Sequence, residues 1–208
     1  MRRPGGADFA PGAYVFPGGT VHRDDAGWPD EIAGAAVREL YEEMGILLAR
    51  KPHPGPLQRV ERGPGRFARE RDCEQVRSLV ADGRTFREAL LSSGLEPAFD
   101  RLVFHARWVT PAQLKRRYDA RFYLARLPAG QTVKAQEGEV TDWLWITPAR
   151  ALSDPDITLV YATRTVLESV ATAEDASTVL ARARRTRDVP IVEPRLVQTA
   201  SGWEIVRD

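Results

Sequence analysis

Three glutamates, Glu39, Glu42 and Glu43, stand at positions i, i+3 and i+4 of a stretch with a helical pattern. At that spacing the three carboxylates lie on one face of a helix. Like charges this close repel each other by roughly 0.2–0.5 kcal/mol per pair, so a solvated surface helix gains nothing from them. Mg²⁺ and Mn²⁺ prefer oxygen ligands and would remove the repulsion. The stretch therefore predicts a helix that carries a divalent-cation site.

The two ends of this helix can also be predicted, and they place it at residues 29–44. Pro29 suits the first helical position, and Asp30 and Glu31 put negative charge in the first turn. Gly45 suits the left-handed residue that follows the last turn. Apolar residues at every fourth position predict the buried stripe, namely Ile32, Ala36, Leu40 and Met44.

The nine residues from Arg38 to Ile46 complete the second half of a known family pattern, the Nudix box. That pattern is G-x5-E-x7-R-E-U-x-E-E-x-G-U, where U is a bulky aliphatic residue. Phe16-Pro17-Gly18-Gly19 precedes the match, as in many members of the family. The chain thus resembles the Nudix hydrolases. A chance match on a solvated acidic helix face is the simpler interpretation, and the length of the match argues against it.

The first half of the box departs from the family pattern by a five-residue insertion. Ten residues separate Gly19 from Asp30, which would then replace the family glutamate. If Asp25 takes that place, the first spacing is right and the second is five residues too long. Both alignments put the insertion in the loop before the helix, where the family shapes its metal and substrate site.

The resemblance implies roles for single residues of the box. Glu39, Glu42 and Glu43 would bind the metal, together with the backbone carbonyl of Gly19. Arg38 would hold the glutamates in place by ion pairing, and the catalytic residues would include Glu42 and Arg38. An ordinary helix salt bridge between positions i and i+4 is the plainer interpretation of Arg38, and the family role partly includes it.

A further acid is expected in the loop before a tryptophan-rich segment. Glu139 lies six residues before Trp145, the spacing at which many family members carry an extra metal ligand or a general base. Glu137 and a glutamate of the box are the alternatives for the base, and both loop acids could instead be solvated. Trp143 and Trp145 are predicted to be strand and core residues.

The resemblance covers Phe9 to Leu152 and implies an α/β fold, an α/β/α sandwich with a mixed β-sheet. Residues 1–208 are interpreted as a single Nudix domain, with a helical insert at 67–93 and a C-terminal extension at 153–208. Hydrophobic periodicity and turn residues predict the other segments. These are strands within 9–16, 102–109, 121–127 and 140–146, a loop at 50–66, helices at 148–152, 158–172 and 174–187, and an extended stretch at 191–206.

Weaker motifs narrow the resemblance to one branch of the family. The helical insert, the runs 108–111 and 118–123, and a tail ending near Pro194 follow the order seen in peroxisomal-type coenzyme A diphosphatases and their bacterial relatives. Residues 12–19 also match the end of a signature of other coenzyme A-cleaving Nudix enzymes, although Asp8 stands where that signature has arginine. The resemblance implies hydrolysis of a diphosphate link in a nucleotide-type substrate, with coenzyme A or acyl-CoA as a candidate.

Two other functions stay open at this point. Another Nudix activity, on ADP-ribose, dinucleotides or nucleoside triphosphates, is one, because specificity lies in loops and in the insert. The other is a non-catalytic ligand-binding module, which the complete set of box glutamates argues against. The basic run at 182–187 is predicted to be a solvated helix end, with contact to a nucleotide phosphate as the less favoured alternative.

Composition limits the partners. The net charge of +1 gives no sign of a protein that binds nucleic acid or a membrane surface, and no apolar run approaches transmembrane length. Cys73 is the single cysteine, which excludes an internal disulfide and a cysteine zinc cluster. We expect a cytoplasmic enzyme that acts on a small molecule with Mg²⁺ or Mn²⁺, with a homodimer as an option.

The N-terminus lacks a strand that Nudix proteins normally place before the segment equivalent to Phe9–Gly19. Met1-Arg2-Arg3 looks like the tail of that strand, and a strand typically needs about 5–6 residues. Its neighbours would be left with costly unpaired backbone groups. Three explanations are open, of which the first is favoured: a start codon placed too late, replacement by residues 196–206, or an exposed edge that pairs with a second chain.

Overall fold

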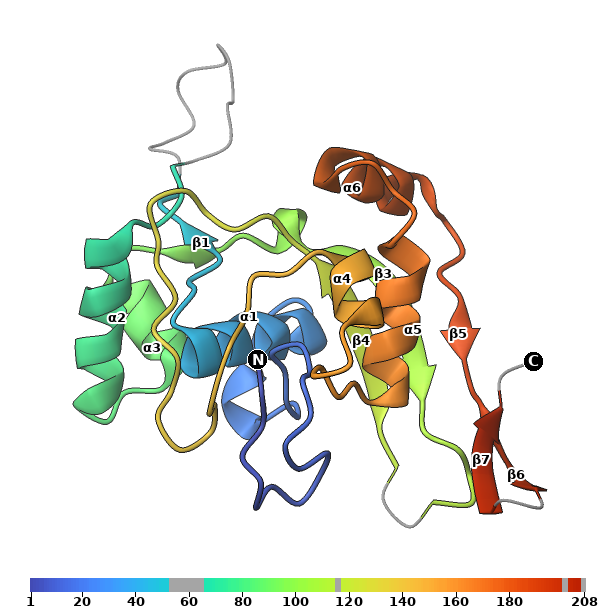
Figure 1. Ribbon diagram of the computed structural model, residues 1–208. Helices are drawn as coiled ribbons and strands as arrows, with labels where there is room; N and C mark the ends of the chain where they lie inside the picture. The colour runs from blue at the N-terminus through green and yellow to red at the C-terminus, as the bar shows by residue number, and fades with distance from the viewer. Residues whose placement is uncertain (53–65, 115–116, 200–201, 207–208) are drawn as a thin grey trace. The chain divides into compact units, whose positions relative to one another are not determined.

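The computed structural model describes residues 1–52, 66–114, 117–199 and 202–206, so most of the loop predicted at 50–66 lies outside the described residues. The chain divides into two compact units. The box unit comprises Pro17–Leu102 and Arg126–Thr141, and the sheet unit comprises Met1–Phe16, Val103–Ala125 and Asp142–Asp208. Figure 1 labels the elements of both units. The interpretation of residues 1–208 as a single domain stays a prediction.

The box unit is mainly helical and contains the predicted glutamate helix and the predicted helical insert (Figure 1). Its two short strands pair antiparallel, with Ala49 opposite Pro97. The elements in chain order are the 3₁₀ turn η1 (Arg23–Asp25), α1 (Glu31–Met44), β1 (Ala49–Arg50), α2 (Glu70–Ala81), α3 (Phe86–Ser92), β2 (Glu96–Pro97) and the 3₁₀ turn η2 (Phe99–Arg101).

The glutamate helix begins two residues later than predicted. Asp30 is its N-cap, and its side chain accepts hydrogen bonds from the N–H groups of Ile32 at 3.0 Å and Ala33 at 3.1 Å. The N-cap Asp30 has extended backbone angles, as a cap residue requires, so the helix begins after it and Pro29 lies outside the helix. At the other end Gly45 is left-handed with φ 69°, which confirms its predicted role.

The buried apolar stripe of α1 differs from the predicted one. At three of the four predicted positions, the buried residue is the next one along the helix. Ile32, Ala36 and Leu40 are only partly buried. The buried apolar positions are Ala33, Val37, Tyr41 and Met44, with Ala35 beside them. The reason is the insert, which lies on that side of the helix and forms the core of the unit with it.

Helices α2 and α3 confirm the predicted helical insert, and Gly83 and Gly94 follow their ends with φ of 89° and 65°. The insert contacts α1 at Tyr41. The Tyr41 hydroxyl donates to the carbonyl of Cys73 at 2.9 Å, and its ring lies 5.4 Å from that of Phe86. The fully buried core around this contact is mostly aliphatic: Val37, Leu47, Leu48, Val76, Ala89, Leu90 and Leu95.

The sheet unit contains a mixed sheet, as predicted, in the order β4-β3-β5. Strand β3 pairs antiparallel with β4 and parallel with β5. A separate hairpin is formed by β6 and β7. The elements are β3 (Val103–Val109), β4 (Asp119–Leu124), α4 (Pro148–Ser153), α5 (Tyr161–Val170), α6 (Ala176–Arg185), β5 (Ile191–Val192), β6 (Arg195–Thr199) and β7 (Gly202–Val206).

Two predicted strands, at 9–16 and at 140–146, are not formed as strands. Each contributes one bridging residue: Tyr14 bridges Arg2 and Leu159, and Asp142 bridges Arg2. The prediction of two core tryptophans is also wrong, because Trp143 is 38% and Trp145 is 69% exposed. An alternating pattern of side chains forms a strand only where a neighbouring segment supplies a row of backbone hydrogen bonds. Among the described residues, the segments beside Tyr14 and Asp142 pair with them at these single bridges only.

The first three residues form backbone hydrogen bonds with the segments around Tyr14 and Asp142. Arg2 donates its N–H to the carbonyl of Asp142 at 2.7 Å, and Arg3 donates to that of Ala13 at 3.0 Å. The explanation that residues 196–206 replace this strand is wrong. Strands β6 and β7 pair with each other, from Arg195 opposite Val206 to Thr199 opposite Gly202.

Candidate metal and catalytic site

Arg38 is the centre of a network of charged side chains in the box unit. It is only 3% exposed, and it donates five hydrogen bonds, one for each N–H of the guanidinium. Its Nη1 donates to Glu39 Oε1 at 2.9 Å and to Glu42 Oε2 at 2.7 Å. Burial lowers the pKa of Arg38, but the hydrogen bonds to Asp25 and Glu42 outweigh burial and raise it.

Asp25 is the main partner of Arg38. The Arg38 Nε donates to Asp25 Oδ1 and its Nη2 to Asp25 Oδ2, each at 3.0 Å, and Asp25 is 1% exposed. Asp30 is the N-cap of α1 instead. The ion pair favours the alignment in which Asp25 is the first acid of the box and the five additional residues follow it, and that alignment stays a prediction. The correct first spacing from Gly19 was the signal in the sequence for this assignment.

The additional residues are held by packing from two helices. Trp28 lies against Gly34 of α1, where an added Cβ would stand 2.3 Å from Trp28 Cδ1. The guanidinium of Arg87, from α3, lies 5.2 Å from the Trp28 ring centre, and the Phe99 ring lies at 5.8 Å. The loop that carries Asp25 is thus supported by the helical insert as well as by α1, which sequence patterns did not reveal.

Gly18 and Gly19 lie close to two glutamates of the box, Glu43 and Glu39 respectively. The Gly18 N–H donates to Glu43 Oε2 at 2.7 Å. A Cβ added at Gly19 would stand 2.3 Å from Glu39 Oε1, which no side chain could accept without displacing that carboxylate. Both Glu39 and Glu43 are buried. The glycine turn therefore determines where these two carboxylates lie, and a metal-ligand role of the Gly19 carbonyl stays a prediction.

Glu42 differs from the other two glutamates because its side chain is 40% exposed. Desolvation raises the pKa of this carboxyl above its usual value. The hydrogen bond and the charge of Arg38 oppose that rise, and the charge of Glu39 adds to it. Glu42 is therefore the glutamate of the box that solvent can reach and that holds a proton more readily than an ordinary glutamate.

The chemistry of these groups fits a hard divalent cation. The Arg38 guanidinium pairs with three carboxylates, those of Asp25, Glu39 and Glu42. The Glu43 carboxylate accepts from the Gly18 N–H, and every candidate ligand atom in this set is an oxygen. Within the part of the chain that the structure describes, no three His, Cys, Asp or Glu side chains are already gathered as a metal-binding set. Arg38 occupies one oxygen of Glu39 and one of Glu42, so metal binding would use their other oxygens or displace these hydrogen bonds.

The two loop acids lie on a segment attached to the end of α1. The Gln136 N–H donates to the carbonyl of Glu43, and the Lys134 N–H donates to that of Met44, both at 2.9 Å. Glu137 and Glu139 follow on this segment with exposed side chains. The backbone thus brings the segment to the last turn of the glutamate helix, while the role of Glu139 as base or ligand stays a prediction.

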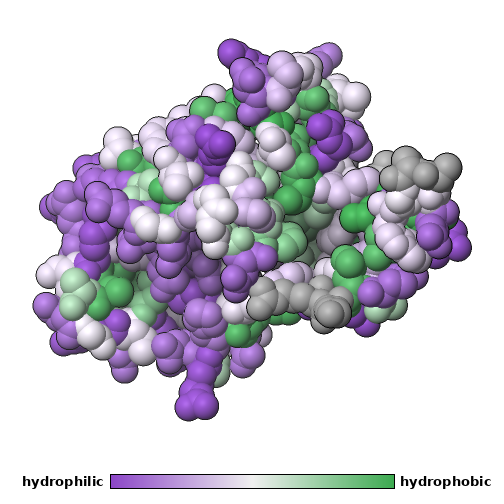
Figure 2. Space-filling model, turned by 60° about the horizontal axis from the view of Figure 1, so that its bottom comes forward, coloured by the Kyte–Doolittle hydropathy of each residue, from purple (hydrophilic) through white to green (hydrophobic). Residues whose placement is uncertain are grey.

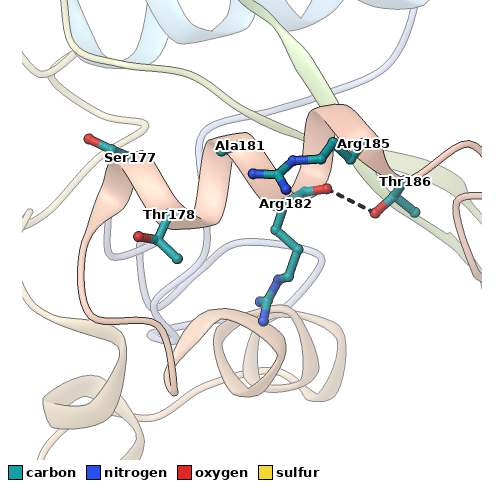
Figure 3. Close-up of a pocket in the computed structure, with 6 residues that line it drawn as sticks. All are labelled: Ser177, Thr178, Ala181, Arg182, Arg185 and Thr186. Carbon is teal, nitrogen blue, oxygen red and sulfur yellow. Dashed lines mark hydrogen bonds between the residues drawn. The ribbon is translucent and has the colours of Figure 1, made fainter.

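The arginine run at the end of α6 lies in the sheet unit. A hollow of about 640 Å³ lies along this helix. It is lined by Ser177, Thr178, Ala181, Arg182, Arg185 and Thr186 (Figure 3). Arg182 Nη2 donates to the Ser169 carbonyl at 2.7 Å. Arg182, Arg184 and Arg185 are exposed, as predicted for a solvated helix end. None of the box carboxylates lines this hollow.

One face of the molecule carries many hydrophilic residues, with groups of hydrophobic ones between them (Figure 2). Trp145 and Trp203 are exposed aromatic side chains. No helix among the residues that the structure describes is long and apolar enough to cross a membrane.

Comparisons with known proteins identify the family of this chain. A family profile described as the NUDT19 Nudix domain matches residues 26–160. Putative nudix hydrolase 7 of Caenorhabditis elegans is 30% identical over 154 residues, which cover 74% of this chain and 48% of that protein. The human acyl-coenzyme A diphosphatase NUDT19 is 33% identical over 133 residues, or 59% of this chain and 34% of that protein. The chain spans about half or less of the length of these two relatives.

A solved structure supports the fold. The crystal structure of a NUDIX hydrolase from Alicyclobacillus acidocaldarius has a TM-score of 0.65 to this chain at 22% sequence identity. The similarity covers 91% of this chain and 87% of that one. Because the family profile matches well over half of the sequence, the chain belongs to the NUDT19 Nudix domain family of the Nudix hydrolase superfamily.

Proposed function

We propose that this chain is a metal-dependent hydrolase that cleaves a diphosphate link in a nucleotide-type substrate. The observation that carries the proposal is the position of Arg38, which holds Glu39 and Glu42 side by side in an excess of negative charge. Such an arrangement costs electrostatic energy in the free protein. A cation that binds the carboxylates would recover that energy.

Glu39, Glu42 and Glu43, with the Gly19 carbonyl, are the proposed ligands of Mg²⁺ or Mn²⁺. When bound, the cation would neutralise phosphate oxygens, lower the pKa of water and stabilise the leaving oxygen. The protein holds the ligands in place. Arg38 restrains Glu39 and Glu42, and the glycine turn restrains Glu39 and Glu43.

A general base is still needed to accept a proton from the attacking water. We propose Glu139 for this role, with Glu137 and Glu42 as alternatives. Glu139 is supported by its exposed position on the segment that bonds to the end of α1. Glu42 is supported by its partial exposure and its raised pKa, which moves a carboxyl toward the range of a useful base.

Coenzyme A, or an acyl derivative of it, is the proposed substrate. Water would attack one phosphorus of the diphosphate, the other phosphate would leave, and the products would be 3′,5′-ADP and a phosphopantetheine. The human relative, which is named acyl-coenzyme A diphosphatase, supports this choice. Helices α2 and α3 pack against α1 within the box unit, so the insert is the proposed border of the pantetheine pocket.

A panel of substrates tests the activity and the specificity together. The purified chain is incubated with coenzyme A, acetyl-CoA, ADP-ribose, NADH and nucleoside triphosphates, with Mg²⁺ or Mn²⁺, and products are identified by mass. We expect the coenzyme A compounds to be cleaved fastest. If ADP-ribose and NADH are cleaved as fast or faster, the coenzyme A assignment fails and the alternative Nudix activities replace it.

Variants of α1 test whether the box performs the reaction. Glu42→Gln and Glu43→Gln should each lower turnover by orders of magnitude, with a thermal unfolding curve like that of the unmodified chain. Glu31→Gln removes a carboxylate from an exposed position of the same helix and should leave turnover unchanged. Full activity in both box variants would exclude this site as the catalytic one.

A further inference from the structure

A second set of charged side chains lies in the sheet unit, on one face of the β4-β3-β5 sheet. A β-bulge at His105 puts Phe104 and Arg107 on the same face of β3, three positions apart. Helix α5 contacts the opposite face, where Trp108 packs on Tyr161 with ring centres 5.6 Å apart. On the face that carries Phe104 and Arg107, the Phe104 ring lies 5.7 Å from that of Tyr123 on β4.

Two arginines face each other on this side of the sheet. Arg107 and Arg121 are direct partners in the antiparallel β3–β4 register, an arrangement that destabilises a sheet unless the charges are compensated. Asp119 compensates Arg107 with two hydrogen bonds, of 2.7 Å to Nε and 2.6 Å to Nη2. Both oxygens of this carboxylate accept from Arg107, and these hydrogen bonds, together with the charges of Arg107 and Arg121, hold the pKa of Asp119 below its usual value.

Arg121 is oriented without such a partner. Its guanidinium lies over the Phe104 ring, 5.8 Å from the ring centre, and it forms no hydrogen bond to any of the described residues. Arg187, on the connection between α6 and β5, is exposed and likewise has no hydrogen-bond partner among the residues that the structure describes. The planar forks of both arginines are therefore free to bind an oxyanion in pairs of N–H donors.

These arginines line one hollow of about 360 Å³. Its wall also includes Phe104 and Ile191, and Ile191 is exposed. Asp188 contributes one opposing negative charge. The volume lies at the small end of the range for ligand pockets and exceeds what a bare oxyanion would fill.

We propose that this hollow binds a small organic phosphate monoester. Arg121 and Arg187 would take the phosphate oxygens, and the Phe104 and Ile191 side chains would contact the organic part. Arg107, whose Nε and Nη2 already donate to Asp119, would mainly add its charge. The inference does not depend on the proposed hydrolase activity, because none of the glutamates of α1 takes part in it.

The larger hollow on α6 is the weaker candidate for such a site. All of its lining residues belong to that helix or to the residue after it, so it has no second wall (Figure 3). One of its two arginines, Arg182, is already bound to the Ser169 carbonyl. The sheet hollow instead combines residues of β3, β4, β5 and the α6–β5 connection.

Binding of phenyl phosphate to the full chain tests the proposal, measured by titration calorimetry and by shifts of backbone amide NMR signals. We expect saturable binding, with the largest shifts at Phe104, Arg121 and Ile191. Arg121→Gln and Arg187→Gln should each weaken binding by about tenfold. Arg185→Gln removes the same charge from the exposed end of α6 and should change the dissociation constant by less than about twofold.

Three results would overturn the proposal. The first is the absence of saturable binding. The second is equal weakening by all three variants, since that would indicate general charge attraction. The third is equal affinity for inorganic phosphate, because the organic part would then make no contact. Unchanged thermal unfolding of Arg121→Gln and Arg187→Gln shows that a loss of binding comes from the site.

Discussion

The guanidinium of Arg38 and the carboxylate of Asp25 form a buried two-pronged ion pair, with both N–O distances at 3.0 Å. The pair joins α1 to the loop that precedes it, across 13 positions of the chain. The other N–H groups of Arg38 hold two glutamates and the Thr20 carbonyl. The stability of the loop and the geometry of the proposed metal site therefore depend on the same side chain.

Replacement of Asp25 by asparagine should destabilise the protein. The change removes a buried charge and leaves Arg38 with less compensation, and the cost of breaking such a pair is about 3 kcal/mol. Urea unfolding measures it. Asp24→Asn changes the adjacent exposed aspartate and should have almost no effect. If both variants are equally stable, Asp25 is not the structural acid of the box.

Replacement of Gly19 by alanine should disturb the site and leave the fold intact. The new Cβ would overlap the Glu39 carboxylate, which must move. A displacement of this size costs on the order of 100-fold in turnover when it affects a catalytic group. The assay is hydrolysis as a function of Mg²⁺ concentration. Gly6→Ala is the control, because nothing lies within 4 Å of a Cβ at that position. Normal activity of Gly19→Ala would contradict the close approach.

Gly34 and Trp28 should behave as a coupled pair. Gly34→Ala should cost about 1–3 kcal/mol in the free energy of unfolding, because its Cβ would clash with the Trp28 ring. In a Trp28→Ala background the same change should be neutral or stabilising, since alanine favours a helix by about 1 kcal/mol over glycine. The double-mutant cycle is measured by urea unfolding, and additive effects would show that the two residues do not touch.

Cys73 should remain an unreactive thiol in the folded protein. It is buried, and desolvation raises its pKa from 9.0 to about 11. Alkylation by iodoacetamide at pH 8 should be slow until urea is added. The folded state binds the thiol proton of Cys73 more tightly than the unfolded state does. The protonated thiol therefore contributes fully to the free energy of unfolding below pH 9, and this contribution is lost as the pH rises through about 11.

The Cys73→Ala variant separates this effect from that of Tyr41, whose pKa burial raises to about 12. The fall in stability between pH 9 and about 11 should be smaller in this variant than in the unmodified chain. Rapid alkylation of the folded protein at pH 8, or an identical pH dependence of the two proteins, would contradict the buried thiol.

Local sequence rules predict the helices well. The spacing of Glu39, Glu42 and Glu43 and the turn residue Gly45 depend only on neighbours within a few positions, and the structure agrees with both. The same holds for the insert, whose two helices end before Gly83 and Gly94. Propensity and capping act over one or two turns, so they can be recognised without knowledge of the fold.

Strand pairing and exposure depend on distant segments, and there the sequence misleads. The alternation around Trp143 and Trp145 is typical of a strand, but the segment forms one bridge, at Asp142, and Trp145 is largely exposed. A strand needs a partner whose position is determined elsewhere in the chain. The same limit applies to Ala13–Phe16, where Tyr14 forms single bridges.

The choice between Asp25 and Asp30 shows where local patterns end and tertiary structure begins. The box pattern identifies the glutamates of α1 and predicts that an acid precedes them, but both aspartates fit one of its two spacings. The path of the loop gives the two aspartates different roles, because it brings Asp25 to the buried guanidinium of Arg38 and leaves Asp30 at the N–H groups of the first helical turn. That path depends on Trp28 and on its packing against Gly34 and Arg87, which are contacts between segments that no local spacing encodes.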